Sequence, residues 1–116
     1  MSQQMGFLAE KEALHYLLSQ GLTWIESNYH CRMGEIDLIM WHGETLVFVE
    51  VKARASRVYG GAVASVTYAK QQKLIKTASL YLLHKKSYDK HPVRFDVIGM
   101  EGVPARVHWI QNAFGL

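Results

Sequence analysis

Two carboxylates and a lysine stand on two neighbouring stretches of apolar sequence. Asp37 lies within the run 35–41, and Glu50 and Lys52 close the run 46–52. Carboxylate oxygens are hard ligands that suit a divalent cation such as Mg²⁺ or Mn²⁺. A lysine beside such a cation could orient a water molecule or stabilise negative charge that develops on a reacting group. These three side chains are therefore the first candidates for chemistry.

The runs 35–41 and 46–52 predict the two strands of a β-hairpin, because they are rich in apolar and β-branched residues and flank the turn residues 42–45. A hairpin loop of even length would place Asp37 opposite Glu50. Directly opposed residues share one face of a sheet, with Cβ atoms roughly 5 Å apart. An odd-length loop would put the two acids on opposite faces. The even register predicts an acid pair whose repulsion a divalent cation would cancel.

Glu50 and Lys52 could instead form a structural ion pair, since E-x-K on an edge strand is a common solubility feature. The residues before them favour a site. Residues 46–49 are apolar on both faces of the strand, and such strands are normally buried. Charges at the end of a buried strand indicate a functional cluster.

A further carboxylate lies on the first predicted helix, residues 5–20. Glu10 is in line with Ala13, Leu14 and Leu17, on the face that should be buried. A carboxylate there is costly unless a cation meets it. Two interpretations stay open: a functional role for Glu10, and a boundary glutamate whose carboxylate reaches solvent.

The other elements complete one domain, 1–116. They are, in order, a strand at 22–29, a turn at 28–34, a loop at 53–66, a helix at 67–86 with Thr67 or Ser65 as N-cap, a polar connector at 87–92, and strands at 94–100 and 105–110. This order of helix, three strands, helix and two strands predicts an α/β or α+β domain with a mixed sheet.

The chain is mildly basic, and its charge is unevenly distributed. The net charge is +3, and ten of the thirteen Lys and Arg residues lie from Lys52 to Arg94, where Asp89 is the only acid. Point charges and the amides of a helix N-terminus bind a phosphate backbone. The candidates for nucleic-acid binding are Arg54, Arg57, Lys70, Gln71 and Lys73. The alternative is a solvated basic helix without a ligand.

Other catalytic and metal-site patterns are missing from the sequence. The six histidines form no H-x₃-H or H-E-x-x-H pair, and there is no P-loop and no G-x-S-x-G. His42-x-Glu44 resembles half of a deaminase zinc site, but no P-C-x-x-C completes it. Asp96 interrupts a predicted strand, where it could support the site or pair with Arg94 or a basic residue of the helix.

The single Cys31 excludes an internal disulfide framework and fits a reducing compartment. The residues from Met1 to Met5 lack the charged and apolar regions of a signal peptide, and no stretch is apolar enough to span a bilayer. We therefore expect a cytoplasmic protein that has no membrane partner.

The candidate residues lie in runs that resemble a known family. The runs GEIDLIM (34–40), VFVEVKAR (47–54), YGGAVASVT (59–67), KQQKL (70–74) and RFDVI (94–98) closely resemble the YraN-like family of uncharacterised bacterial proteins. The resemblance covers nearly the whole chain. That family looks like a member of the restriction-endonuclease-like superfamily, with its PD-(D/E)xK site, and is similar to archaeal Holliday-junction resolvases. The resemblance implies a three-layer core with a central mixed sheet flanked by helices.

Carried over by position, the resemblance implies that Asp37 and Glu50 are metal ligands and that Lys52 is the catalytic lysine. Glu10 would be the first-helix carboxylate that approaches the metal. The resemblance also places Lys70 and Gln71 on the helix that follows the site. Ile36 stands where the motif has proline, a departure that many superfamily members share.

Residues and resemblance together predict a Mg²⁺-dependent or Mn²⁺-dependent endonuclease acting on nucleic acid, chiefly on branched, flapped or single-stranded DNA. A chain of 116 residues has little room for an element that reads base sequence. One alternative is a nucleic-acid-binding module with little or no hydrolytic activity that serves a DNA repair or recombination assembly. Another is a scaffold in which the cluster is only a buried ion network. A homodimer would supply the two sites that cutting both strands of a junction needs, although the sequence gives no direct sign of one.

Overall fold

An apolar strand forms the centre of the sheet. In the computed structural model, which describes residues 2–54, 66–102 and 104–115, β3 (Thr45–Arg54) lies between β2 (Gly34–His42) and β4 (Val93–Glu101). Residues 46–50 of β3 are all buried, because the sheet is covered on both faces. The prediction of a buried central strand is confirmed.

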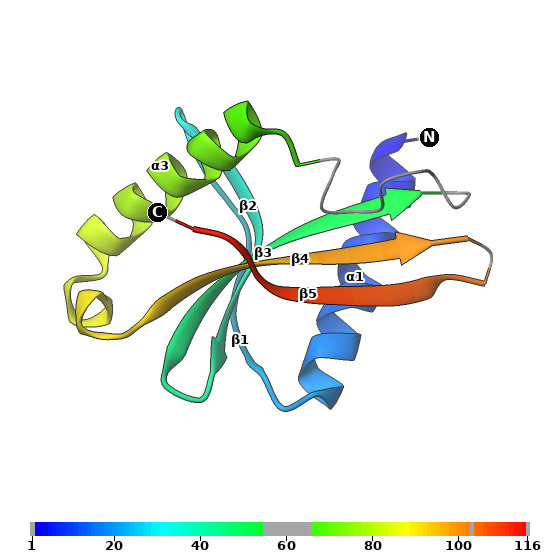
Figure 1. Ribbon diagram of the computed structural model, residues 1–116, viewed down its shortest axis with the longest axis horizontal. Helices are drawn as coiled ribbons and strands as arrows, with labels where there is room; N and C mark the ends of the chain where they lie inside the picture. The colour runs from blue at the N-terminus through cyan, green and yellow to red at the C-terminus, as the bar shows by residue number, and fades with distance from the viewer. Residues whose placement is uncertain (1, 55–65, 103, 116) are drawn as a thin grey trace.

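The remaining elements complete a mixed five-stranded sheet with the strand order β1-β2-β3-β4-β5 (Figure 1). They are α1 (Ser2–Ser19), β1 (Thr23–Cys31), α3 (Tyr68–His84), the 3₁₀ helix η1 (Lys86–Lys90) and β5 (Arg106–Phe114). Neighbouring strands are antiparallel except β3 and β4, which are parallel and are joined by the crossover that contains α3. The predicted α+β domain with a mixed sheet is confirmed.

Each helix covers one face of the sheet, which gives three layers. Successive side chains of a strand point to opposite faces. Accordingly, Ile39 and Phe48 pack with Leu74, Ala78 and Tyr81 of α3, whereas Met40, Val47 and Val49 pack with Ala13 and Leu17 of α1. The apolar face predicted for the first helix is therefore the buried one. No helix in the described part of the chain is long and apolar enough to cross a lipid bilayer.

The β2–β3 hairpin has the predicted even register. Trp41 pairs with Leu46, and the same register continues to Leu38 and Val49, one step before the two acids. Gly43 begins the two-residue loop with a φ of +63°, the conformation that a type II′ hairpin turn requires at this position. Asp37 and Glu50 therefore arrive at the same end of the hairpin.

Several sequence-based boundaries were wrong. The turn predicted at 28–34 is limited to residues 32 and 33, because β1 continues to Cys31 and β2 begins at Gly34. The helix predicted at 67–86 ends at His84, and most of the connector predicted at 87–92 belongs to the 3₁₀ helix η1, which begins at Lys86.

The last strand does not end at residue 110 but continues to Phe114. The pairing of β5 with β4 is irregular between Phe95 and Val97 of β4. In the facing part of β5, Asn112 has a φ of +53°. This bulge breaks the alternation of side chains, which is why the pattern hid the end of the strand.

A fully buried carboxylate stabilises that bulge. Asp96 accepts hydrogen bonds from Arg94 Nε (2.8 Å), from Trp109 Nε1 (2.9 Å) and from the backbone N–H of Asn112 (2.9 Å). Arg94 Nη2 also lies 2.9 Å from Nδ1 of His42. Of the two interpretations of Asp96, the pair with Arg94 is confirmed.

Replacing Asp96 by Ala should destabilise the protein by about 3–5 kcal/mol, because it leaves the largely buried Arg94 without its counter-ion. Chemical denaturation followed by circular dichroism measures this loss. Gln111→Ala, an exposed change on β5, is the control and should stay within about 0.5 kcal/mol of wild type. Equal stability of the two variants would contradict the role given to Asp96.

Candidate metal and nucleic-acid site

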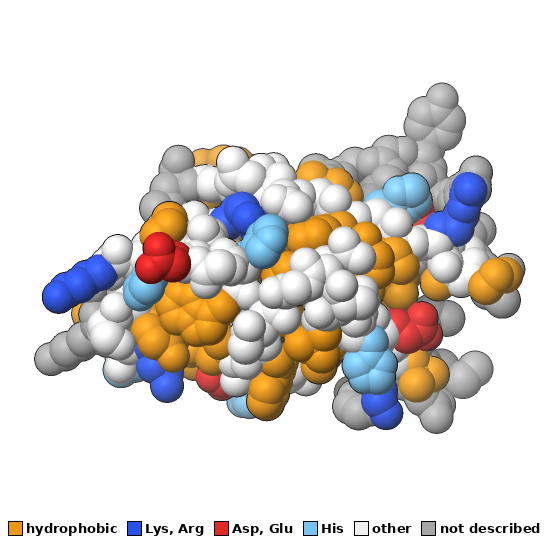
Figure 2. All heavy atoms as spheres, turned by 90° about the horizontal axis from the view of Figure 1, so that it is seen from below, with side chains coloured by type: hydrophobic (Ala, Val, Ile, Leu, Met, Phe, Trp, Pro, Cys, Tyr) orange, Lys and Arg blue, Asp and Glu red, His pale blue; other side chains and the backbone are white. Residues whose placement is uncertain are grey.

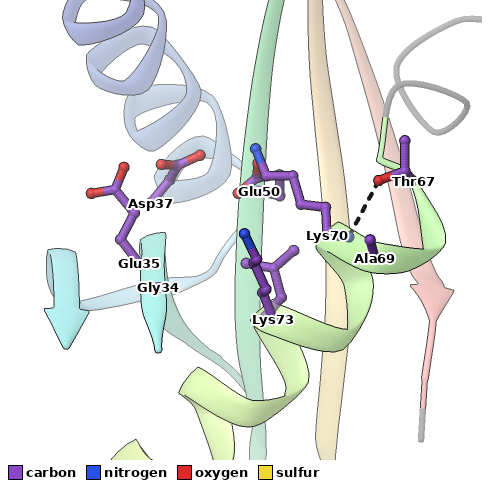
Figure 3. Close-up of a pocket in the computed structure, with 9 residues that line it drawn as sticks. Gly34, Glu35, Asp37, Glu50, Thr67, Ala69, Lys70 and Lys73 are labelled. Carbon is purple, nitrogen blue, oxygen red and sulfur yellow. Dashed lines mark hydrogen bonds and ion pairs between the residues drawn. The ribbon is translucent and has the colours of Figure 1, made fainter. Parts of the chain in front are cut away.

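A pocket of about 420 Å³ lies between the β2–β3 hairpin and the first turns of α3 (Figure 3). Asp37 and Glu50 line it from the strands, and Lys70 and Lys73 line it from the helix. Its volume falls within the range of about 300–1,000 Å³ that is usual for ligand sites. The pocket therefore brings together acids and lysines that lie far apart in the sequence.

Of the three acids that line the pocket, Glu35 is exposed, whereas Asp37 and Glu50 are almost completely buried. Asp37 is 8% exposed and Glu50 is 5% exposed. Asp37 is held in place because its Oδ2 accepts a hydrogen bond of 2.8 Å from the backbone N–H of Val51 on the neighbouring strand. The two carboxylates that the hairpin register was expected to bring together do meet at one pocket.

Near Asp37, the apolar side chains of β2 change from one face of the sheet to the other. Ile36 belongs to the core beneath α3, whereas Leu38 belongs to the core beneath α1. In a regular strand, residues two apart share a face. This irregularity places Asp37 at the boundary between the two cores, where groups from both helices reach it.

Glu10 approaches Asp37 from α1. Burial raises the pKa of Glu10, the neighbouring polar side chains of Asp37 and Asn28 oppose this change, and the negative charges of Glu35 and Glu50 add to it. The structure therefore places Glu10 beside the acid pair and leaves it partly buried.

The environment of Asp37 favours its protonated form. Burial raises the pKa of Asp37 to about 8, with repulsion from Glu50 and Glu10 adding to the effect and the bond from Val51 opposing it. At pH 7 without a bound cation, Asp37 therefore retains a proton. Two ionised carboxylates here would repel each other, and without a cation the proton on Asp37 prevents this repulsion.

Two lysines share the other acid. Lys70 Nζ lies 2.7 Å from Glu50 Oε2, and Lys52 Nζ lies 3.4 Å from the same oxygen. Burial, together with contact with Lys70, lowers the pKa of Lys52. Burial also opposes the charge on Lys70, but its contact with Glu50 outweighs this, so the pKa of Lys70 is raised. Lys70 is therefore the more firmly charged of the two.

The N-cap of α3 positions the helix lysines. The side chain of Thr67 accepts a hydrogen bond of 3.2 Å from the backbone N–H of Lys70, so Thr67 is the cap among the two candidates. Capping fixes the first turn, and Lys73 follows one turn later along the pocket (Figure 3).

Gly34 allows the hairpin to approach α3 closely, a role that the sequence analysis missed. Its φ is +153°, and a Cβ at this position would lie 3.0 Å from Thr77 Oγ1. Thr77 is fully buried and donates a 2.8 Å hydrogen bond to the carbonyl of Lys73, so it cannot move aside easily. A glycine at the start of an otherwise apolar strand was the available signal.

Other predicted residues have different surroundings. Lys73 is exposed at the pocket. The side-chain amide of Gln71 donates to the carbonyl of Val66 at 3.0 Å and so serves the start of the helix. The side chain of Arg54, the whole of Arg57 and the sequence Tyr59-Gly60-Gly61 lie outside the described residues.

The donor atoms of the pocket fit a hard divalent cation. Within residues 2–54, 66–102 and 104–115, no group of three or more His, Cys, Asp or Glu side chains is arranged to hold a metal. Asp37 and Glu50 therefore offer two carboxylates. Mg²⁺ is commonly bound by one or two carboxylates, with water and substrate phosphate as the other ligands. Such a cation would replace the proton on Asp37 and allow both carboxylates to be ionised.

Comparison with known proteins identifies the family. Residues 9–100 match the model described as "Uncharacterised protein family UPF0102". The chain belongs to this family. It is 50% identical over 114 residues to a UPF0102 protein of Legionella pneumophila subsp. pneumophila, which covers 98% of this chain and 97% of the relative. A UPF0102 protein of Pseudomonas syringae pv. syringae is 49% identical over 115 residues (97% and 94%), and one of Alcanivorax borkumensis is 50% identical over 109 residues (91% and 87%). The family expected from the sequence is confirmed, and its description assigns no activity.

Replacing Asp37 by Asn should stabilise the cation-free protein at high pH. The pKa of Asp37 is about 8 in the folded state and 3.8 in the unfolded reference, so its proton adds stability that is complete below about pH 3.8 and is lost as the pH rises through about 8. Asparagine stays neutral and keeps an acceptor for the Val51 N–H. The melting temperature in EDTA should therefore fall more steeply with pH in wild type than in Asp37→Asn.

The control for this comparison is Glu44→Gln, an exposed change in the hairpin turn. Its melting temperature should follow that of wild type at every pH. If Asp37→Asn does the same between about pH 5 and about pH 9, the protonated state assigned to Asp37 is wrong.

Proposed function

We propose that this protein is a Mg²⁺-dependent or Mn²⁺-dependent endonuclease that hydrolyses phosphodiester bonds of DNA. The observation that carries the proposal is the buried pair of Asp37 and Glu50 facing one open pocket, with the amino groups of Lys52 and Lys70 beside it. Burying like charges together costs stability, and such clusters are typical of functional sites.

The residues of the pocket divide the work of phosphodiester hydrolysis. Asp37 and Glu50 would hold the cation, and Glu10 would approach it from α1. A cation held there would polarise the phosphodiester and lower the pKa of a bound water. Lys52, with Nζ 3.4 Å from Glu50 Oε2, would orient the attacking water or donate hydrogen bonds to a non-bridging phosphate oxygen.

The distribution of basic side chains supports a nucleic acid as the substrate. Lys70 and Lys73 line the pocket on the first turns of a capped helix, where backbone amides also favour phosphate. The face shown in Figure 2 is different. Hydrophobic side chains occupy much of its middle, and its Lys and Arg side chains are scattered singly over the face without forming a patch. The pocket is therefore the better candidate for binding a phosphate backbone.

The architecture favours recognition of DNA shape over base sequence. The described residues mainly form the five strands of the sheet, the two helices that cover it and one 3₁₀ helix. None of these described elements stands apart from the core as a groove-reading helix would. Contacts to phosphates carry no sequence information, so we propose branched, flapped or single-stranded DNA as the substrate class.

Binding of Mg²⁺ or Mn²⁺ should raise the melting temperature of wild type. A ligand present at 100 times its Kd stabilises a folded protein by about 2.7 kcal/mol. We expect no such increase in Asp37→Ala, which lacks one of the two carboxylates, and an undiminished increase in Glu44→Gln. A wild-type protein that neither binds the cations in calorimetry nor gains stability from them would rule out the metal site.

Nuclease activity is tested with labelled duplex, flapped, single-stranded and four-way-junction DNA in the presence of Mg²⁺. Wild type should cut at least one branched or unpaired substrate, and Glu50→Gln and Lys52→Ala should each reduce the rate by about 100-fold or more. Cleavage that persists in both variants would indicate a contaminating nuclease. Binding of these substrates by wild type without any cleavage would instead identify a non-hydrolytic DNA-binding module.

A further inference from the structure

Lys70 makes the shortest ion pair of the pocket. Its Nζ is 2.7 Å from Glu50 Oε2, whereas Nζ of Lys52, the lysine of the E-x-K pattern, is 3.4 Å from the same oxygen. A distance of 2.7 Å lies at the short end of the range for charge-assisted N–H···O bonds. The strongest partner of the buried Glu50 therefore comes from α3, across the crossover.

This contact occupies one of the two Glu50 oxygens that could bind a divalent cation. The Glu50 side chain is only 6% exposed, so its carboxylate has few other directions from which to accept a ligand. An ammonium group and a metal ion that both approach Oε2 repel each other strongly at short range. A cation can use Glu50 fully only if Lys70 moves away from it.

Lys70 has somewhere to move. The N-cap bond from Thr67 fixes its backbone, but its side chain is 43% exposed and borders the open pocket. In Figure 3 the side chain extends from the helix across the pocket toward Glu50, and Lys73 lies beside it. A rotation of the lysine side chain alone would turn Nζ from the acid toward the space in which a phosphate would lie.

We propose that Lys70 is a positioning residue that competes with the divalent cation for Glu50 and, once displaced, binds a phosphate of the nucleic acid. This inference rests on the proposed function. Cation and nucleic acid then favour each other's binding. A bound cation displaces Lys70 from Glu50 and frees it to bind a phosphate, and a bound phosphate holds Lys70 away from Glu50. By thermodynamic linkage the two effects have the same size.

The test compares Lys70→Gln with Lys73→Gln, the matched change one turn further along α3. Mg²⁺ binding is measured by calorimetry on the full-length protein without DNA. Lys70→Gln should bind Mg²⁺ about fivefold more tightly than wild type, because the competing ammonium is gone. Lys73→Gln should leave the Mg²⁺ affinity unchanged. Lys70→Arg keeps the positive charge and should also remain close to wild type.

The second measurement is the Kd for a fluorescent, cleavage-resistant phosphorothioate single-stranded DNA by anisotropy, with Mg²⁺ or with EDTA, and a gel confirms that the DNA stays intact. In wild type Mg²⁺ should tighten DNA binding, and in Lys70→Gln this gain should shrink by about the same fivefold factor. In Lys73→Gln the DNA affinity should fall equally under both conditions. Circular dichroism confirms that each variant is folded.

The outcomes separate this inference from the proposed function. Unchanged or weaker Mg²⁺ binding by folded Lys70→Gln, with normal binding by wild type, overturns the role of Lys70 and leaves the metal site in place. Absence of Mg²⁺ binding by wild type overturns both. Tighter Mg²⁺ binding together with a reduced gain in DNA affinity supports the competition.

Discussion

The cost of burying two carboxyl groups side by side is the constraint on which this structure depends. Asp37 and Glu50 are held near each other where water screens them poorly, so ionising both is costly and the pKa of Asp37 is raised. The surrounding groups limit this cost without removing it. The Val51 N–H fixes Asp37, and Lys70 and Lys52 share one oxygen of Glu50. A fold that tolerates such a cluster must gain its stability elsewhere.

That stability comes from the two apolar cores that enclose the central strands. Their boundary coincides with the site, because β2 changes its apolar face at Asp37. Glu10 therefore reaches the acid pair from α1, and Lys70 reaches it from α3. One end of the hairpin thus receives groups from both outer layers. In this way a small domain with two helices gathers six ionisable side chains around one position: Glu10, Glu35, Asp37, Glu50, Lys52 and Lys70.

Features set by short-range patterns could be predicted from the sequence, whereas those set by packing between distant elements could not. The hairpin register followed from loop length and strand periodicity, and it correctly brought Asp37 and Glu50 to one pocket. The contact of Lys70 with Glu50 depends on how α3 is rotated against the sheet, which no local pattern encodes. The same reason hid the close approach at Gly34.

The parallel pairing of β3 with β4 determines when the pocket can form. The β2–β3 hairpin is local in sequence and carries both acids, so a nascent chain that ends after β3 presents them to solvent as ordinary carboxylates. Their burial waits for the crossover to close, which brings α3 and β4 onto the hairpin through contacts of large sequence separation. Such contacts form slowly. The altered acidity of this cluster thus depends on contacts between segments that lie far apart in the sequence, and not on the hairpin alone.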